Sequence, residues 1–440
     1  MIPEGTTLVI APDSSSNEVA EHILLKAVNI DVIVLDHHEA SHDLTDPAII
    51  VNNHMCDYPN KGLSGVGIVY KFCKVLDSVL KVSYADDFLD LVALGMVADM
   101  MDMRELETRY LTWKGMQQPQ NPFIVGMMEK NEYKIQGKLT PFTIGWYVAP
   151  FVNAMCRSGA LFEKRVLFQS LLEYMAPKLV PSTKKRGGKG QEETILTQAL
   201  RTAGNVKSHQ DDEKKRVLPI IRKLIAEQKL DECSIIIVQV PGEMESTLNG
   251  LVANQLMSEY KKPVLVLTKR EKDVVFEIKN GEKITGPNKI ITWEGSARAY
   301  VTAGIDNWRN WIADSGFCEY AEGHALAFGV GFTPEKLELF KDFCKRTFPT
   351  TPEAIHKVDF IWDYKTPNLG LEILNIAEYK DIWGQGVKEP LVVIKDVPVQ
   401  RSQFILAGKG TLKILVPRTN ITCIKFGYGE EQYNNIADLY

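Results

Sequence analysis

Two patterns of apolar and polar positions alternate along the first hundred residues. Short apolar runs predict buried strands at 6–11, 31–36 and 48–53. Apolar residues spaced three or four apart predict helices at 16–28, 67–80 and 85–100, the first opened by a Ser/Asn cap. This alternation predicts a parallel α/β sheet with helices on both faces, whose chemistry collects at the carboxyl ends of the strands.

The central part of the chain has a helical pattern from about 104 to 180, with an expected loop at 147–160. A Pro/Gly-rich basic stretch at 181–193 is typical of a flexible loop. The highly charged segment 193–230 has helical spacing and is expected to connect two domains.

A second α/β pattern starts with an expected strand at 233–240, a helix at 246–260 and a strand at 263–269. Further strands or loops follow at 274–280, 291–300 and 324–330, and a closing helix at 334–348. The tail, 357–440, consists mainly of short β runs with turn signals, which favours a small barrel or sandwich.

Composition narrows the class of protein. A net charge of −5 gives no overall attraction to nucleic acid, so any polyanion site must be a local patch. The 7 cysteines are scattered without a CxxC pair, which favours reduced thiols in the cytoplasm over a disulfide scaffold or zinc ribbon. No signal peptide opens the chain, and no apolar run reaches the roughly 18 residues of a membrane span.

Candidate chemistry gathers where strands are expected to end. Asp36, His37 and His38 end one strand, and Asp13 lies past the end of its neighbour. A double histidine alone fits a solvated turn equally well. Asp99, however, follows an apolar helix and can fold back to the same rim. Carboxylates with imidazole and no thiol suit a hard divalent ion such as Mn²⁺ or Mg²⁺.

With Asp13 before it and "ALGMVADM" after it, "LDHHEA" resembles the DHH phosphoesterase family. Five further motifs, in this order along nearly the whole chain, resemble RecJ-type single-strand-specific 5′–3′ exonucleases: "LSGVGIVYKF", "VAPFVNAMCRSG", "EGSARAY", "AEGHALAFGV" and "IWGQGVKEP". The ordered set is a specific signal, although each motif alone is weak.

The resemblance implies the domain plan. We expect a parallel-sheet DHH domain at 1–180, a basic loop and connecting helix at 181–230, a DHH-associated α/β domain that binds nucleic acid at 231–352, and a β-rich OB-like domain at 353–440. The OB fold suits single strands.

The resemblance also implies a metal centre with two ions, Mn²⁺ or Mg²⁺. Asp13 matches a ligand that bridges them, and His37 and Asp99 match ligands of one ion. Asp36 is expected to orient the site from behind the ligands. His38 is expected to face the phosphate that is cleaved.

The remaining matched residues concern nucleic acid. Asn153 and Arg157 match positions that line the strand's path, and Ser296 and Arg298 match an element that holds a 5′-phosphate. His324 matches a Gly-His loop presented to the phosphate. In isolation, Ser296 and Arg298 would fit a turn and a surface charge, and His324 a capped loop histidine.

The basic residues Lys184, Lys185 and Arg186 fit a solvated linker and a DNA contact equally well. Glu322 departs from the family, which usually has glycine there, and an acid near a phosphate would repel it.

A larger departure lies at the amino terminus. RecJ-like chains begin with a strand that ends in paired aspartates, whereas the only acid among the twelve residues before Asp13 is Glu4. One metal site is therefore expected to be incomplete. The chain would be a truncated or internally initiated product, a separate polypeptide would supply the strand, or catalysis has been lost. Intact downstream motifs favour the first explanation.

The sequence thus predicts a metal-dependent nuclease that digests single-stranded DNA from its 5′ end in repair, recombination or replication. A single-strand-binding protein or a helicase is a candidate partner. One rival is a DHH-family phosphodiesterase acting on short oligonucleotides or cyclic dinucleotides, which the β-rich tail and long connecting helix disfavour. The other is a single-strand-binding protein without catalysis.

Overall fold

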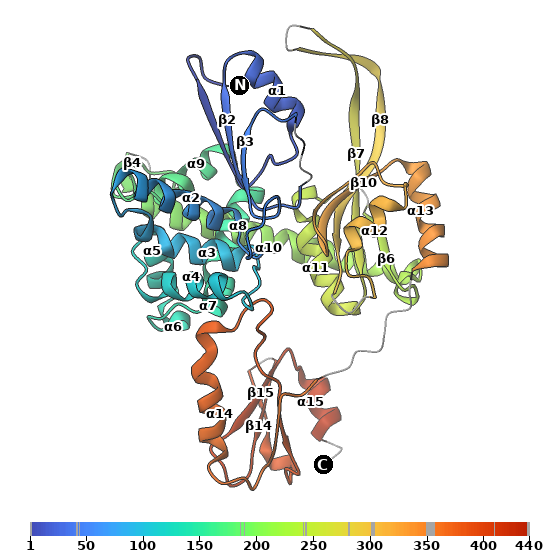
Figure 1. The fold of residues 1–440 in the computed structure, drawn as a ribbon. Coiled ribbons are helices and arrows are strands. Elements are labelled where there is room, and N and C mark those ends of the chain that lie inside the picture. Colours follow the sequence, from blue (N-terminus) through green and yellow to red (C-terminus); the bar gives the residue numbers. More distant parts are fainter. Residues whose placement is uncertain are drawn as a thin grey trace.

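The computed structural model describes residues 2–437 except 41–42, 44, 185, 189, 241, 243, 280–281, 301–303, 349–356 and 409. Figure 1 shows a small sheet above a layer of helices, a second sheet with a long protruding ribbon beside them, and the C-terminal region below. Among the described residues, no helix is both long enough and apolar enough to cross a membrane.

The amino-terminal sheet is parallel, as predicted, with the order β1-β2-β3. Its elements are β1 (Leu8–Pro12), α1 (Val19–Ala27), β2 (Asp31–Asp36) and β3 (Ile49–Asn52). The predicted Ser/Asn cap of α1 is wrong, because Glu18 precedes the helix without a side-chain cap. Ser16 is used elsewhere: its N–H donates to Asp36 Oδ2 and its Oγ accepts from Asn52 Nδ2.

Helices form the layer below this sheet. They are α2 (Gly65–Leu80), α3 (Leu89–Ala98), α4 (Leu106–Gln117), α5 (Pro122–Lys130), α6 (Glu132–Ile135), α7 (Pro141–Tyr147), α8 (Ala149–Ser158) and α9 (Leu161–Ser170). The loop predicted at 147–160 is wrong, because most of it forms α8. Pro150 suits the first turn, where its missing N–H breaks no helical bond, and Ala154 and Met155 bury one face of the helix.

A single helix of 33 residues, α10 (Ile195–Glu227), follows, as predicted for the connecting segment. Just before it, β4 (Leu179–Pro181) and β5 (Glu192–Thr194) pair as a small antiparallel sheet on either side of the basic stretch. Within that stretch, Lys185 and Lys189 lie outside the described residues.

The second sheet has the order β6-β7-β8-β10-β9. Its strands are β6 (Ile236–Val240), β7 (Val264–Lys279), β8 (Glu282–Arg298), β9 (Tyr320–His324) and β10 (Ala327–Phe332), and its helices are α11 (Asn249–Tyr260), α12 (Trp308–Asp314) and α13 (Pro334–Thr347). The segments predicted at 263–269 and 274–280 form one strand, β7. Together with β8 it makes the protruding ribbon in Figure 1.

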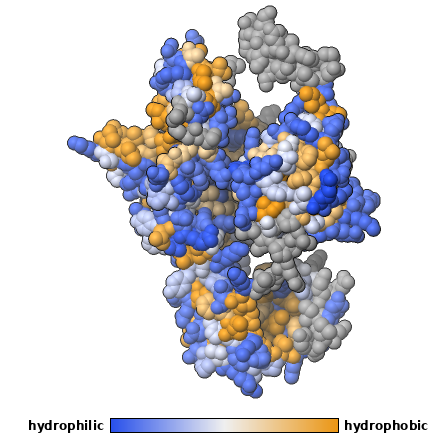
Figure 2. All heavy atoms as spheres, turned by 45° about the vertical axis from the view of Figure 1, so that its right-hand side comes forward, coloured by the Kyte–Doolittle hydropathy of each residue, from blue (hydrophilic) through white to orange (hydrophobic). Residues whose placement is uncertain are grey.

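The C-terminal region holds β11 (Phe360–Asp363), α14 (Leu369–Ala377), β12 (Val392–Lys395), β13 (Phe404–Ala407), β14 (Thr411–Leu415), β15 (Thr422–Phe426) and α15 (Glu430–Ala437). In the described part, β11 and β12 pair apart from the sheet of β13, β14 and β15, so an OB-like barrel remains a prediction. Figure 2 shows apolar surface on this region, where Ile361, Leu371 and Leu374 are each more than half exposed.

Candidate metal and phosphate site

Asp13 is fixed at the end of β1 by the backbone. Its N–H donates to the carbonyl of Leu35 at 2.9 Å, and its φ is 61°. A Cβ built on Gly65 would lie 2.3 Å from Asp13 Oδ1, so only glycine there leaves room for the carboxylate. Gly65 begins α2, and a helix amino terminus favours a negative charge. This explains the glycine of the "LSGVG" motif.

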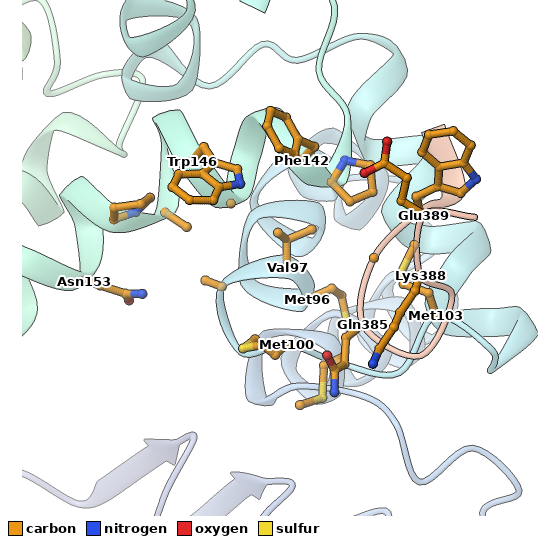
Figure 3. Close-up of a pocket in the computed structure, with 18 residues that line it drawn as sticks. Met96, Val97, Met100, Met103, Phe142, Trp146, Asn153, Gln385, Lys388 and Glu389 are labelled. Carbon is orange, nitrogen blue, oxygen red and sulfur yellow. The ribbon is translucent and has the colours of Figure 1, made fainter. Parts of the chain in front are cut away.

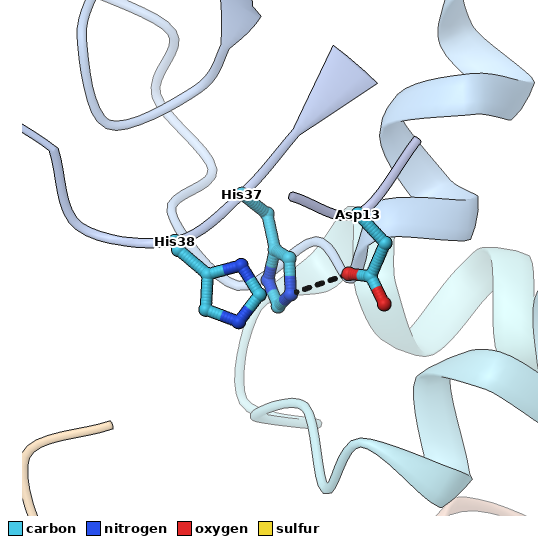
Figure 4. Close-up of side chains that lie close together, drawn as sticks. All are labelled: Asp13, His37 and His38. Atoms are coloured by element: carbon cyan, nitrogen blue, oxygen red, sulfur yellow. Dashed lines mark ion pairs between the residues drawn. The ribbon is translucent and has the colours of Figure 1, made fainter. Parts of the chain in front are cut away.

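His37 joins Asp13 to Asp99. Its Nε2 lies 3.2 Å from Asp13 Oδ1 and 3.1 Å from Asp99 Oδ2, and Figure 4 shows the first of these contacts. The His37 side chain is only 3% exposed, whereas Asp13 is 63% exposed. Asp99 is the C-cap residue of α3, the apolar helix that the sequence predicted before it.

This arrangement fits a divalent ion. His37 Nε2 is buried and makes no aligned hydrogen bond, although two carboxylates lie beside it. Donor atoms of Asp13, His37 and His38 lie within 4.8 Å of one another, the only such group of three or more among the residues that the structure describes. Asp99 is outside this group, although its Oδ2 lies 3.1 Å from His37 Nε2. Imidazole and carboxylate donors without a thiol suit Mn²⁺ or Mg²⁺.

Asp36 orients the two histidines rather than facing the cluster. It is buried, and its Oδ1 accepts from the backbone N–H of His37 at 2.8 Å and lies 2.8 Å from His38 Nδ1. Burial opposes ionisation of Asp36, but hydrogen bonds from His38 and Ser16 outweigh it and hold the pKa of Asp36 below its usual range. The same hydrogen bond raises the pKa of His38.

The second sheet brings His324 to this rim. The ring of His324 stacks with His38 at a centroid distance of 5.5 Å, and its Nε2 lies 3.7 Å from Asp99 Oδ1. Arg309 of α12 holds the two parts together, because it donates to Glu39 Oε2 at 2.5 Å and to the carbonyl of Gly323 at 2.6 Å. No pattern in the sequence pointed to Arg309.

Ser296 and Arg298 form a second cluster at the end of β8. A Cβ built on Gly250, at the start of α11, would lie 2.8 Å from Arg298 Nη2 and 3.5 Å from Ser296 Oγ. Burial, and secondarily the charge of Arg157, lowers the pKa of Arg298 to about 10. Within the described chain, no carboxylate within ion-pair distance balances this guanidinium. Two cations beside a helix amino terminus suit a phosphate.

Asn153 and Arg157 lie four residues apart on α8 and therefore share one face. Asn153 lines a cavity that also includes Met100, the residue after Asp99 (Figure 3). The predicted basic contacts are not brought to the site: Lys184 and Arg186 lie between β4 and β5, and Figure 1 shows β4 at the far edge of the helical layer from the second sheet. Sequence reasoning missed Gly250, which no motif distinguished.

Comparisons with known proteins identify a family and relatives that match most of the chain. The DHH family, N-terminal domain, matches residues 1–96. Bacillus subtilis YorK, provisionally named a prophage-derived single-strand DNA-specific exonuclease, is 33% identical over 98% of this chain and 71% of its own length. The single-stranded-DNA-specific exonuclease RecJ of Bacillus subtilis is 23% identical over 97% of this chain.

Among solved structures, RecJ from Thermus thermophilus in complex with Mn²⁺ matches with a TM-score of 0.71 and 19% identity, over 97% of this chain. This chain spans 50% of the length of Bacillus subtilis RecJ and 57% of the Thermus chain. The fold is shared with the Thermus structure along 97% of this chain, and the identity to YorK extends over 98% of it. The chain therefore belongs to the RecJ-like single-strand-DNA-specific exonucleases of the DHH family.

Proposed function

We propose that this chain hydrolyses single-stranded DNA from its 5′ end with a divalent metal, Mn²⁺ or Mg²⁺. The observation that carries the proposal is the convergence of Asp13, His37 and Asp99 around a buried nitrogen that has no aligned hydrogen bond. Related solved structures, named as RecJ complexes with Mn²⁺ and with Mg²⁺, support the choice of metal.

Asp13, His37 and Asp99 would hold the metal. A bound divalent ion generates a nucleophile from water and stabilises charge on the phosphate. These three residues leave ligand positions open, so a second ion with its own protein ligands would need groups beyond the cluster. An incomplete second metal site stays a prediction.

The chain's own residues would position the strand. Ser296 and Arg298 would grip the 5′-phosphate, with Arg157 adding positive charge. His38 and His324 stack face to face beside Asp99, so both can donate hydrogen bonds to the phosphate that is cleaved. Asp36 keeps His38 in place and favours its protonated form.

The domain plan inferred from the sequence is part of this proposal: DHH domain, connecting helix, DHH-associated domain and OB-like region. So is a partner that supplies single strands, such as a single-strand-binding protein or a helicase. A second candidate function, strand binding without cleavage, is favoured by one observation. Among the described residues, only one group of three possible ligands, Asp13, His37 and His38, lies close together.

The proposal is tested with one oligonucleotide labelled at either end, incubated with the chain and Mn²⁺. A 5′ label should be released at once as a mononucleotide. A 3′ label should remain on a fragment that becomes progressively shorter. Single strands with a 5′-phosphate should be digested faster than those with a 5′-hydroxyl. Undiminished binding without any digestion would support the non-catalytic candidate instead, and faster cleavage of dinucleotides would favour the small-substrate phosphodiesterase.

A further inference from the structure

A groove of about 520 Å³ runs beside the metal cluster. One wall is the end of α3 and the segment after it, another is α7 and the start of α8, and the third is the segment 383–389 (Figure 3). Its floor is apolar and includes Met96, Val97 and Met103. Asn153 lies at one end and Lys388 at the other (Figure 3).

The third wall is anchored to the helical layer. The N–H of Met103 donates to the carbonyl of Gln385 at 2.7 Å, and Lys138 pairs with Asp381 at 2.5 Å. Gly386 has a φ of 80°, and a Cβ built on it would lie 2.0 Å from Asp102 Oδ1. The close contact and the backbone conformation both require glycine. This wall of the groove is therefore pre-formed, because a backbone hydrogen bond and an ion pair hold it.

Two aromatic rings stand open in this groove. Phe142 is 58% exposed and Trp146 is 65% exposed, and the two residues lie one turn apart on α7. Their centroids are 5.9 Å apart and their planes are tilted by 40°. Met100, across the groove, is 63% exposed. Large apolar side chains gathered in a concave site indicate a ligand with flat apolar faces.

The groove is continuous with the site already described. Met100 directly follows the metal-cluster residue Asp99, and Asn153 lies one helical turn from Arg157. From Arg157, the path along α8 and back along α7 leads past Asn153 to Trp146 and Phe142, away from the phosphate cluster. A single strand whose cleaved phosphate lies at the metal cluster would carry its bases, which have flat faces, into this groove.

We infer that Phe142 and Trp146 are a stacking platform for bases of the single strand, on the side of the cleavage point away from the 5′-phosphate. The inference rests on the proposed function for the strand's direction. Base stacking on aromatic rings tolerates any sequence, which suits digestion along a whole strand, and Lys388 at the far end meets the phosphate backbone. An apolar protein segment is the competing occupant.

The test measures binding in EDTA, so that cleavage plays no part. A 5′-phosphorylated single strand is compared with the same strand carrying abasic positions beyond its second nucleotide. Wild-type protein should bind the abasic strand about tenfold more weakly. The double variant Phe142→Ala, Trp146→Ala should bind the intact strand about tenfold more weakly and should no longer distinguish the two strands.

Two controls separate stacking from general damage. Tyr133→Ala removes an aromatic ring that is 93% exposed on α6 outside the groove, and should leave binding unchanged. Phe142→Tyr with Trp146→Tyr keeps flat rings and should restore most of the affinity. Both groove positions are exposed, so truncation should not unfold the chain.

The inference is overturned if the double variant retains the wild-type difference between intact and abasic strands. It is also overturned if the wild type binds no single strand. Wild-type digestion failing while the abasic effect is present would overturn only the proposed function, so the two failures are distinguishable. Affinity for an apolar peptide, with no response to bases, would identify the groove as a protein-docking site.

Discussion

At the scale of single residues, His37 is the position on which the metal assignment depends most. The sequence predicted its partners because the ends of adjacent parallel strands meet at one rim. It did not predict Gly65 as the residue that makes room for Asp13, because a glycine's neighbours depend on the tertiary packing. Nor did it single out Gly250, which lies in an ordinary helical pattern far along the chain from its contact, Arg298.

His37→Gln should weaken Mn²⁺ binding by at least about tenfold, since even residues behind the ligands change metal affinity by that amount. Isothermal titration with Mn²⁺ measures the effect. His209→Gln, at an exposed position on α10, is the matched control and should bind like the wild type. Equal affinity in both variants would mean that His37 is not a ligand.

Gly250→Ala should selectively reduce the preference for a 5′-phosphate. The added Cβ would displace the Arg298 guanidinium, whose Nη2 would lie 2.8 Å from it, without breaking the helix. The ratio of digestion rates for 5′-phosphorylated and 5′-hydroxyl strands is the measurement, and it should fall several-fold. Gly370→Ala, also the second residue of a helix but facing open space, should keep the wild-type ratio. An unchanged ratio in Gly250→Ala would remove Gly250 from the phosphate cluster.

At the scale of elements, the sequence located most strands and helices but not how they continue or end. The run 147–160 was predicted to be a loop, although its Pro150 is well tolerated in a first helical turn. The two halves of β7 were separated because the polar residues between them face solvent on a ribbon. Both errors arise because local patterns do not show which side of an element will be covered.

The packing of α13 on the second sheet predicts an alkaline loss of stability. Burial raises the pKa of the Cys344 thiol to about 12 from the ordinary 9.0. Above pH 9 the unfolded chain loses this proton while the folded chain keeps it. The contribution is therefore fully present below pH 9 and is lost as the pH rises towards 12.

Urea unfolding at pH 8 and pH 10.5 measures this contribution. Cys344→Ala should be less stable than the wild type at pH 8, because it leaves a cavity, but the difference should shrink at pH 10.5. Cys56→Ala, at an exposed cysteine, should show no such change. A constant difference between wild type and Cys344→Ala would mean that the thiol titrates normally in the folded chain.

At the scale of the whole molecule, the sequence patterns located the two α/β sheets and the long helix between them, but not the contacts that bring the second sheet to the metal site. The resemblance placed His324 at the phosphate, and the structure brings it within 3.7 Å of Asp99. The contact that accompanies this, Arg309 with Glu39, joins residues 270 positions apart. Both residues lie in sequence segments with an ordinary surface pattern, so no local signal identifies the pair.

Arg309→Met should lower the rate of strand digestion several-fold and leave Mn²⁺ affinity unchanged, because the proposed ligands all lie on the amino-terminal side. Its loss frees Gly323 and so loosens His324. Arg222→Met, which breaks an exposed ion pair with Glu259 far along α10, is the control for losing a surface charge. A change in metal affinity, or an unchanged rate of digestion, would argue against a role of Arg309 in holding His324 at the metal site.

Above all, we propose that the rim of Asp13, His37 and Asp99 is a metal-dependent site for digesting single-stranded DNA. The most direct test follows nucleotide release from a 5′-phosphorylated single strand by the wild-type chain and by His37→Gln, in chelator and then with excess Mn²⁺. We expect release by the wild type only, and only after Mn²⁺ is added. Release in chelator, or equal release by His37→Gln, would contradict the claim.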